Sequence, residues 1–244
     1  LRQPMARFLI SVILVAVIGN STEAQYTACS GADSILEQHL LTIGKLADRF
    51  LSDPNRFVSG RLYLPRGTRD NNPYFLDNEW KSGSVQFNGV RFSVSMMKYD
   101  LEIDAPVILK VYENTGYSIS LDKRLIPEFT IADHRFVYFE KARMTGYYEE
   151  LYNLRTGLWA KWTKWGKLDA NSVSGTPVYN SRLFFIIRRN NEYYEAKNLK
   201  ELLKIYADRK PELQQFIRAN RLSYIRDKTG TVLKLTEQYD MLNN

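Results

Sequence analysis

Three tryptophans and three lysines are interleaved in LWAKWTKWGK, residues 158–167, and no other stretch of the chain is as well suited to holding a ligand. Tryptophan offers a broad apolar face with one N–H group, and lysine offers a positive charge. On a strand, Trp159, Lys161 and Trp165 share one face. Trp162 falls on the other face, where we predict the core. Trp159, Lys161 and Trp165 are therefore the predicted ligand-binding residues, with the two tryptophans as an exposed pair.

A helix is the alternative for the same stretch. The tryptophans would then line one side and the lysines the other, as in a helix that lies on a membrane surface. Gly157 and Gly166 leave room for only about two helical turns, which is marginal for an isolated helix. The preceding YYEELYNLRTG supplies a partner strand and a turn. The sequence therefore favours a β-hairpin.

A second group with chemical potential is DLEID, where Asp100, Glu102 and Asp104 alternate with aliphatic residues. On a strand the three carboxylates would share one face, and hard oxygen ligands of this kind suit calcium. Calcium loops usually also carry Gly and Asn turns that wrap the ion, and DLEID has none. We interpret the carboxylates as a solvated strand face and predict no metal site.

The chain has few of the residues and motifs that commonly form catalytic or metal sites. The chain has two histidines, His39 and His134, and a single cysteine, which makes a zinc site of the usual kind improbable. We interpret His134, which follows Asp133 at a predicted turn, as structural or solvated. No serine stands in a Gly-x-Ser-x-Gly elbow, and no phosphate-binding or dinucleotide-binding loop occurs. We predict no catalytic residue and no cofactor, so an enzymatic activity is not expected.

The amino-terminal segment has the pattern of a secretory signal peptide: Arg7 precedes the apolar run FLISVILVAVIG, and polar residues follow. The run is shorter than the roughly 20 residues of a membrane-spanning helix. We predict cleavage after Ala24, with no transmembrane helix in the mature chain. Lipidation of Cys29 is the alternative, although Tyr26 stands where a lipoprotein signal has an aliphatic residue. Either way the protein is predicted to be exported, to the periplasm, cell surface or extracellular medium.

The formal net charge is +7 at pH 7, and the one cysteine excludes an intramolecular disulfide. The chain is long enough to bury a full core without one. Export without disulfides favours a bacterial envelope. A basic balance suits nucleic acid, anionic lipid or acidic polysaccharide, but the charge is spread widely. We interpret it as a solvated basic surface and regard nucleic acid as an unlikely partner.

The elements that position these residues are predicted to be mainly strands. SVQFNGVRFSV is the clearest hairpin, because Asn88 and Gly89 separate two alternating apolar runs. Further strands are predicted at residues 57–64, 106–112, 117–121, 128–131, 136–139, 147–153 and 183–188.

Helices are predicted at both ends. The spacing of SILE is that of a capping box that begins a helix over residues 34–50. In the tail, Asn198 caps one helix, Pro211 lies in the first turn of a second, and residues 231–242 form a third. The domain prediction is a signal peptide at 1–24, a lead with an amphipathic helix at 25–55, an antiparallel β domain at 56–196, and a helical tail packed on it at 197–244. The predicted fold class is mainly β (α+β): a meander, a sandwich or a partly closed barrel.

Three phrases carry a resemblance to a known family: MKYDLEIDAPVILK (97–110), GYYEELYNLRTGLWAKWTK (146–164) and YYEAKNLKELLKIYADRKPELQQFIRANRL (193–222). With the order of the parts, they resemble uncharacterised secreted proteins of Bacteroidetes bacteria. The resemblance implies a signal peptide, strand pairs and a short helical tail. It implies no catalytic residue, because that family has none assigned.

Three functions are compatible with these features. The first is a non-catalytic envelope protein that binds a protein, a glycan or a lipid or serves a structural role, as the 13% aromatic content favours. The second is an envelope hydrolase that uses carboxylates such as Asp100, Glu102 or Asp133. The third is a carrier of a lipid or another hydrophobic ligand, in a curved sheet closed by helices. We favour the first.

Overall fold

The computed structural model of the protein describes residues 38–39, 41–42, 55–141, 144–168 and 177–243. The chain divides into two compact units, Leu1–Asp53 and Pro54–Asn244. The described residues of the first unit are helical. The predicted signal peptide, Cys29 and the rest of the predicted helix over residues 34–50 lie outside the described residues.

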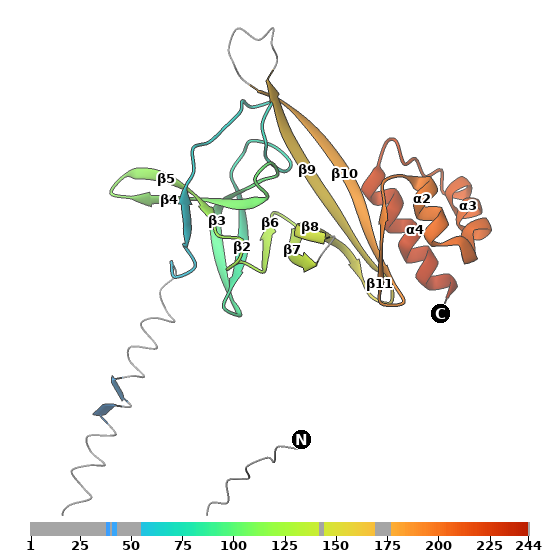
Figure 1. Cartoon of the computed structure of the whole chain (residues 1–244), viewed down its shortest axis with the longest axis horizontal. Helices are drawn as coiled ribbons and strands as arrows, with labels where there is room; N and C mark the ends of the chain where they lie inside the picture. Colours follow the sequence, from blue (N-terminus) through green and yellow to red (C-terminus); the bar gives the residue numbers. More distant parts are fainter. Residues whose placement is uncertain (1–37, 40, 43–54, 142–143, 169–176, 244) are drawn as a thin grey trace, which may run out of the picture. The chain divides into compact units, whose positions relative to one another are not determined.

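In the second unit the described residues form one antiparallel sheet of eleven strands, which is not closed into a barrel (Figure 1). The predicted mainly β, antiparallel class is confirmed. The strands are β1 (Gly60–Leu62), β2 (Lys81–Phe87), β3 (Val90–Asp100), β4 (Ala105–Tyr112), β5 (Thr115–Leu121), β6 (Glu128–Ile131), β7 (His134–Lys141), β8 (Met144–Asn153), β9 (Gly157–Leu168), β10 (Pro177–Arg189) and β11 (Glu192–Ala196).

The order of the strands in the sheet is β1-β5-β4-β3-β2-β6-β7-β8-β9-β10-β11. Strands β2 to β5 follow one another by hairpins in one direction, and β6 to β11 follow one another in the opposite direction from the other side of β2. The sheet is therefore two meanders that meet where β2 pairs with β6.

Residues with positive φ close the hairpins. Asn88 and Gly89, with φ of 48° and 76°, form the tight turn between β2 and β3, so the predicted hairpin is confirmed. Asn190 and Asn191, with φ of 52° and 62°, do the same between β10 and β11. Asparagine and glycine are the residues that reach this conformation most easily, and the resulting twist matches that of the strands.

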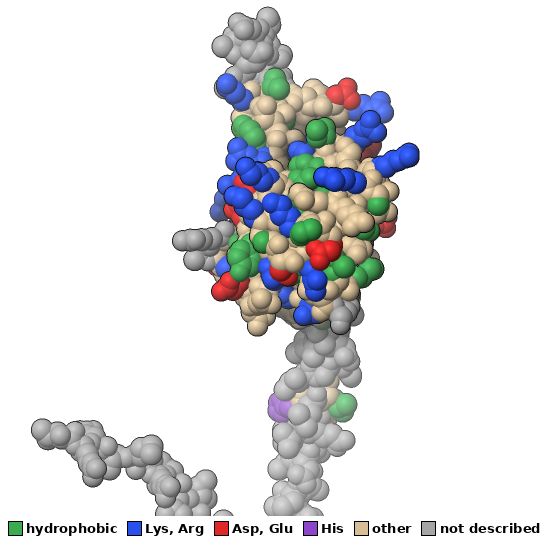
Figure 2. All heavy atoms as spheres, turned by 90° about the vertical axis from the view of Figure 1, so that its right-hand side faces the viewer, with side chains coloured by type: hydrophobic (Ala, Val, Ile, Leu, Met, Phe, Trp, Pro, Cys, Tyr) green, Lys and Arg blue, Asp and Glu red, His purple; other side chains and the backbone are tan. Residues whose placement is uncertain are grey.

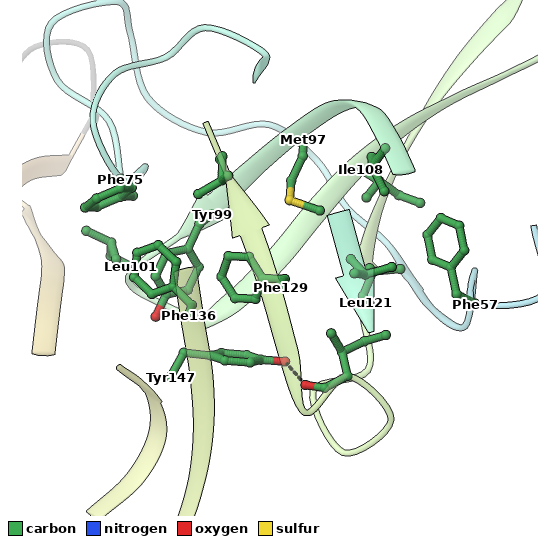
Figure 3. Close-up of a cluster of buried hydrophobic side chains, with 14 residues drawn as sticks. Phe57, Phe75, Met97, Tyr99, Leu101, Ile108, Leu121, Phe129, Phe136 and Tyr147 are labelled. Atoms are coloured by element: carbon green, nitrogen blue, oxygen red, sulfur yellow. Dashed lines mark hydrogen bonds between the residues drawn. The ribbon is translucent and has the colours of Figure 1, made fainter. Parts of the chain in front are cut away.

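The core of the first meander and of β6–β8 is aromatic (Figure 3). The rings of Phe129 and Phe136 are stacked, with centroids 4.9 Å apart, and the ring of Tyr99 lies 4.8 Å from that of Phe136. The Tyr147 hydroxyl donates a hydrogen bond of 2.7 Å to the Ile126 carbonyl, so its polar end is satisfied inside the core. Each such buried ring contributes roughly 2–3 kcal/mol by leaving water.

The tail packs on the face of the sheet formed by β9, β10 and β11. It comprises α2 (Leu199–Ile205), a short 3₁₀ turn, η1 (Ala207–Arg209), α3 (Lys210–Ala219) and α4 (Lys228–Leu242). Asn198 caps α2 by accepting from the Glu201 amide, and Pro211 lies in the first turn of α3, both as predicted. The rings of Tyr206 and Tyr239 stack at 4.2 Å and join α2 to α4.

Candidate functional site

The tryptophan stretch forms most of β9, so the prediction of a strand in a hairpin with β8 is confirmed. Pairing with β8 ends at Ala160, and pairing of β10 with β11 ends at Phe185. Beyond these points β9 and β10 pair only with each other. We call this two-stranded segment, residues 161–168 and 177–184, the arm.

Trp159 lies in the inner half of β9 and is buried, with 3% of its surface exposed. The predicted exposed pair of Trp159 and Trp165 is therefore wrong for Trp159. The reason is that aromatic side chains from neighbouring strands cover this face: the rings of Phe139 and Tyr193 lie 5.4 and 6.0 Å from the indole. The indole N–H of Trp159 has no hydrogen-bond partner among the described residues.

Lys161 is buried as well. Its ammonium donates 2.9 Å hydrogen bonds to the Asp104 carboxylate and to the Tyr147 carbonyl, and it lies 5.0 Å from the centre of the Tyr148 ring. Burial lowers the pKa of Lys161 despite the neighbouring carboxylate. Lys161 therefore anchors β9 to the turn after β3, and its side chain is not presented to solvent as a ligand site.

The three carboxylates of DLEID do not share a strand face, which corrects that prediction. Asp100 ends β3, and residues 101–104 form the turn to β4. The Asp100 carboxylate accepts from the amides of Glu102 and Ile103 and so closes the turn. Asp104 takes a positive φ of 55° and points to Lys161. Turn chemistry overrides the alternating pattern here.

Asp100 is fully buried and its charge is fully engaged. It accepts hydrogen bonds from the Tyr63 hydroxyl at 2.6 Å and from the Arg66 guanidinium at 2.8 Å. Burial, with the hydrogen bond to Asp100, raises the pKa of Tyr63 well above its usual range. Glu102 pairs with Arg66 at 2.7 Å and accepts from the Gly166 amide at 2.9 Å. These carboxylates hold the fold and the arm.

The loop between β1 and β2 also holds the arm. The Asn71 side chain accepts from the Tyr179 amide at 2.9 Å and donates to the Pro177 carbonyl at 2.7 Å. On the other strand, the Lys164 ammonium donates to the carbonyls of Tyr74 and Asn72 at 2.6 and 3.1 Å. Both strands of the arm are thus fixed from outside the sheet.

The contact with Asn71 shows which groups of β10 face away from β9. The N–H and C=O of one residue point to the same side of a strand, and the side alternates along the chain. Because the Tyr179 amide and the Pro177 carbonyl point outward, those of Ser181 and Leu183 do so too. Within the part of the chain that the structure describes, no hydrogen-bond partner satisfies these outward groups of Ser181 and Leu183. They form an open edge.

A groove of about 990 Å³ runs along this open edge. Residues 181–184 of β10 form one wall, and residues 225–229, before and at the start of α4, form the opposite wall with Lys197. Consecutive residues of a strand point to opposite faces, so a groove lined by four in a row follows the strand's edge. Trp165, 43% exposed, stands at the groove with the Arg182 guanidinium 5.7 Å above its ring. We call this the edge groove.

The edge groove is basic. Arg182, Lys197, Arg226 and Lys228 line it, and among the described residues that line it Asp227, whose carboxylate caps α4, is the one acidic residue. Arg182, Arg226 and Lys228 form no ion pair with any residue that the structure describes. Figure 2, which looks onto the side that carries the helical tail, shows Lys and Arg side chains outnumbering Asp and Glu. The surplus charge thus extends beyond the groove.

A smaller pocket of about 360 Å³ adjoins the edge groove, because Trp162, Ser181 and Thr229 line both. Its walls include the apolar side chains of Phe75, Leu76, Leu101 and Trp162, with His134, Glu149 and Lys164 as charged groups. We call it the His134 pocket. Trp162 therefore faces the interior as predicted, but at the border of two cavities and only half-buried.

His134 and Glu149 form a pair in this pocket. The His134 Nδ1 is hydrogen-bonded to one carboxylate oxygen of Glu149, and the other oxygen accepts from the Trp162 indole at 2.6 Å. Glu149 is buried, whereas His134 is about a third exposed. The hydrogen bond that His134 donates to the Glu149 carboxylate raises the pKa of His134, against the opposing effect of partial burial. The imidazole is therefore oriented and biased toward its charged form.

Sequence reasoning missed Glu149 and the open edge. Glu149 stands in YYEELY among residues of a strand, and nothing in that pattern indicates a histidine 15 positions earlier as its partner. Adjacent antiparallel strands do bring such residues together. The open edge depends on where β11 stops, and pairing lengths are not encoded in local patterns.

No group of three or more potential metal ligands occurs among the described residues. None of the helices in the described part of the chain has the length and apolar character to cross a membrane. Comparison of the chain with protein-family models, with curated proteins and with solved structures gives no match.

Proposed function

We propose that the protein is an exported, non-catalytic binding module, and that it holds an extended acidic segment of a partner protein along the open edge of β10. The observation that carries the proposal is the pair of outward, unpaired backbone groups at Ser181 and Leu183 inside a basic groove. Extended peptides bind sheet edges by continuing the backbone hydrogen bonds, while side-chain pockets supply specificity.

The edge already accepts a partner of this kind within the chain. At Pro177 and Tyr179, the Asn71 amide donates and accepts as the backbone of a neighbouring strand would. From Phe185 onward, β10 pairs with β11, and Phe185 itself lies opposite Ala196. Ser181 and Leu183 lie between these two occupied positions, so a short extended segment would complete an edge that is already paired on both sides.

The charge of the groove selects an acidic segment. Four basic side chains line the edge groove, against the carboxylate of Asp227, which caps α4. Trp165 and Ile225, which is 91% exposed, supply apolar contact surface. A segment that alternates acidic and apolar residues would place one kind of side chain on each side of the strand.

Export rests on the amino-terminal sequence and on the resemblance to secreted proteins. Mass spectrometry of the mature protein tests it. A chain that begins at Gln25 supports cleavage of a signal peptide, and a diacylglyceryl group on Cys29 supports a lipid anchor. A cytoplasmic protein that retains the apolar run FLISVILVAVIG would contradict export.

The two alternative functions receive less support. A hydrolase would need free carboxylates, and Asp100 and Glu102 are engaged in holding the turn and the arm. A lipid carrier would need a large apolar cavity. The apolar pocket measures about 360 Å³, close to the lower end of the roughly 300–1,000 Å³ of small-molecule sites.

The test uses the full chain and a fluorescently labelled, blocked peptide of alternating glutamate and valine, with binding followed by anisotropy. Ser181→Pro removes one outward N–H without touching the hydrogen bonds to β9, and Ser181→Ala is its matched control. We expect Ser181→Pro to weaken binding about tenfold relative to Ser181→Ala, as the loss of one or two hydrogen bonds predicts.

A charge-reversed variant, Lys197→Glu with Lys228→Glu, should also weaken binding about tenfold at low salt, and added salt should reduce the difference. A peptide of alternating lysine and valine should not bind. Equal affinity of the Ser181→Pro and Ser181→Ala variants would overturn strand addition, even if an acidic polysaccharide such as polygalacturonate then bound through charge alone.

A further inference from the structure

The His134 pocket has an apolar body and a charged end. The rings of His134 and Trp162 lie 4.9 and 5.5 Å from the ring of Phe75, and Leu101 adds an aliphatic wall. Such a surface suits a flat or short apolar group. The charged residues His134 and Lys164 line the same pocket, so a ligand that enters meets apolar walls and positive groups together.

The imidazole of His134 is held in one orientation. Its Nδ1 faces Glu149, and Glu149 is itself fixed by the Trp162 indole. Among the residues that the structure describes, none forms a hydrogen bond with the Nε2 of His134. A carboxylate behind one ring nitrogen fixes the tautomer and leaves the other nitrogen for a ligand.

Lys164 supplies a second donor. Its ammonium has three N–H groups, of which two donate to the Tyr74 and Asn72 carbonyls. Both acceptors are neutral carbonyl groups, and the nearby Asp100 carboxylate acts on Lys164 through charge without a salt bridge among the described residues. Partial burial lowers the pKa of Lys164, against the opposing effect of the Asp100 carboxylate.

The charges around His134 come from several elements. Asp133 precedes it in the turn before β7, Arg135 follows it, Glu149 faces it from β8, and Lys164 lines the same pocket from β9. Arg135 is paired with Glu128 and Glu150. When His134 is protonated it offsets Glu149. Lys164 then adds a positive charge inside the pocket, which the Asp100 carboxylate stabilises, and Asp133 is an exposed charge outside it.

Leu76 marks the rim of the pocket. It is half exposed and has a φ of 63°, a conformation that costs a bulky side chain of this kind on the order of 1 kcal/mol. Such strain persists where the surrounding structure imposes it, and ligand clamps are among the places where it gathers. The backbone at Leu76 therefore places a half-exposed apolar side chain in the wall of the pocket.

We propose that the His134 pocket binds a small carboxylate with an apolar body, such as an aryl or short acyl acid, whose carboxylate accepts hydrogen bonds from His134 and Lys164. The site adjoins the edge groove, with which it shares Trp162, Ser181 and Thr229, but it binds its ligand through other polar groups. The proposal gives a role to the ionisable pair of His134 and Glu149. Packing alone does not require this pair, since glutamine at either position could make a neutral hydrogen bond.

Nuclear magnetic resonance of the imidazole tests the proposal directly, because the chain has only two histidines and His39→Gln leaves His134 alone. Benzoate and hexanoate are the probes, and methyl benzoate is the uncharged control. We expect both acids to shift the His134 ring signals in a saturable way and to raise its midpoint of titration. Methyl benzoate should not. Equal shifts with the ester, or no shift with either acid, would overturn the proposal.

A matched pair of variants at the rim separates charge from folding. Leu76→Asp places a carboxylate at the entrance, and Leu76→Asn has nearly the same shape without charge; both residues tolerate positive φ. We expect benzoate to bind about tenfold more weakly to Leu76→Asp than to Leu76→Asn. Equal binding would contradict the carboxylate site. The variant Lys197→Glu with Lys228→Glu changes the adjoining edge groove, and it should weaken benzoate binding less than Leu76→Asp does.

The pH dependence has a defined sign. The anion binds best when His134 is protonated, and the carboxylate of Glu149 raises the pKa of His134 above its ordinary value. Affinity for benzoate should therefore be high at pH 6 and fall as pH rises through that raised pKa. The affinity that remains above it comes from the charge of Lys164. Affinity that rises from pH 6 to pH 9 would contradict the assignment.

Discussion

The inner and outer halves of β9 contain similar residues in opposite surroundings. Trp159, in the inner half, is 3% exposed, whereas Trp165, on the same face of the outer half, is 43% exposed. The inner half has β8 on one side, β10 on the other and side chains over both faces. Among the described strands, the outer half pairs only with β10. Neighbouring strands, rather than residue type, decide which tryptophan reaches solvent.

The comparison also separates two ways of accommodating a lysine. Lys161 is buried beside the carboxylate of Asp104, whereas Lys164 donates to neutral carbonyl groups. The first arrangement stabilises the fold by pairing a buried charge, and the second leaves a charge available to an anion. Two lysines three positions apart therefore have different roles, one structural and one proposed for binding.

The largest effect expected from this comparison is at Trp159. Trp159→Ala should lower the free energy of unfolding by about 4 kcal/mol, because it removes a large buried ring and leaves a cavity. Trp165→Ala should change the same quantity by no more than about 0.5 kcal/mol, because the ring is partly exposed. Urea unfolding followed by circular dichroism measures both.

Trp159→Phe is the control for the first variant. It retains most of the ring and removes an indole N–H that has no hydrogen-bond partner among the described residues, so it should cost much less than alanine. Similar losses at Trp159→Ala and Trp165→Ala would show that the two halves of β9 do not differ in burial.

An intermediate effect is expected at Lys161. Lys161→Met leaves the Asp104 carboxylate without its cation and should lower the free energy of unfolding by about 2 kcal/mol. Lys161→Met combined with Asp104→Asn should recover part of that loss, because no unpaired charge remains. Thermal and urea unfolding of the wild type, both single variants and the double variant give the coupling energy.

The matched comparison is Lys164→Met, which removes a charge that forms no salt bridge among the described residues and donates to two carbonyl groups. Its loss of stability should be smaller than that of Lys161→Met, and Asp104→Asn should not alter it. Additive effects of Lys161→Met and Asp104→Asn would contradict a coupled buried pair.

Local patterns predicted much of the fold, as particular elements show. The apolar alternation and the Asn-Gly turn predicted β2 and β3, because a two-residue turn with positive φ fixes its own hairpin. The caps at Asn198 and Pro211 predicted two helices for the same local reason. The strand predicted at residues 183–188 is only the inner part of β10, since the outer part is extended by pairing with β9 in the arm.

The candidate site was less predictable, because its features depend on distant partners. Lys161 was expected between two exposed tryptophans. Instead it forms a buried ion pair with Asp104, which lies 57 positions earlier in the chain. DLEID was expected to be one strand, yet Asp100 closes a turn. His134 was expected to be structural or solvated, and its contact with Glu149 arises only when β7 and β8 align.

The smallest effect is expected at His134, and its sign follows from linkage between protonation and folding. Glu149 raises the pKa of His134 in the folded chain, above the value of about 6.5 in the unfolded chain. The folded state then binds the proton more tightly. The contribution of the pair to stability is fully present below about pH 6.5 and is lost as pH rises through the raised pKa.

His134→Gln should therefore reduce stability more at pH 5.5 than at pH 9, because glutamine can still donate to Glu149 but cannot carry the charge. The extra loss at low pH should stay below about 1 kcal/mol, since the imidazole is about a third exposed and water screens the pair. Urea unfolding at both pH values measures it, with His39→Gln, at an exposed helical position, as the control. A larger loss at pH 9 than at pH 5.5 would reverse the sign and show that His134 is neutral in the folded protein.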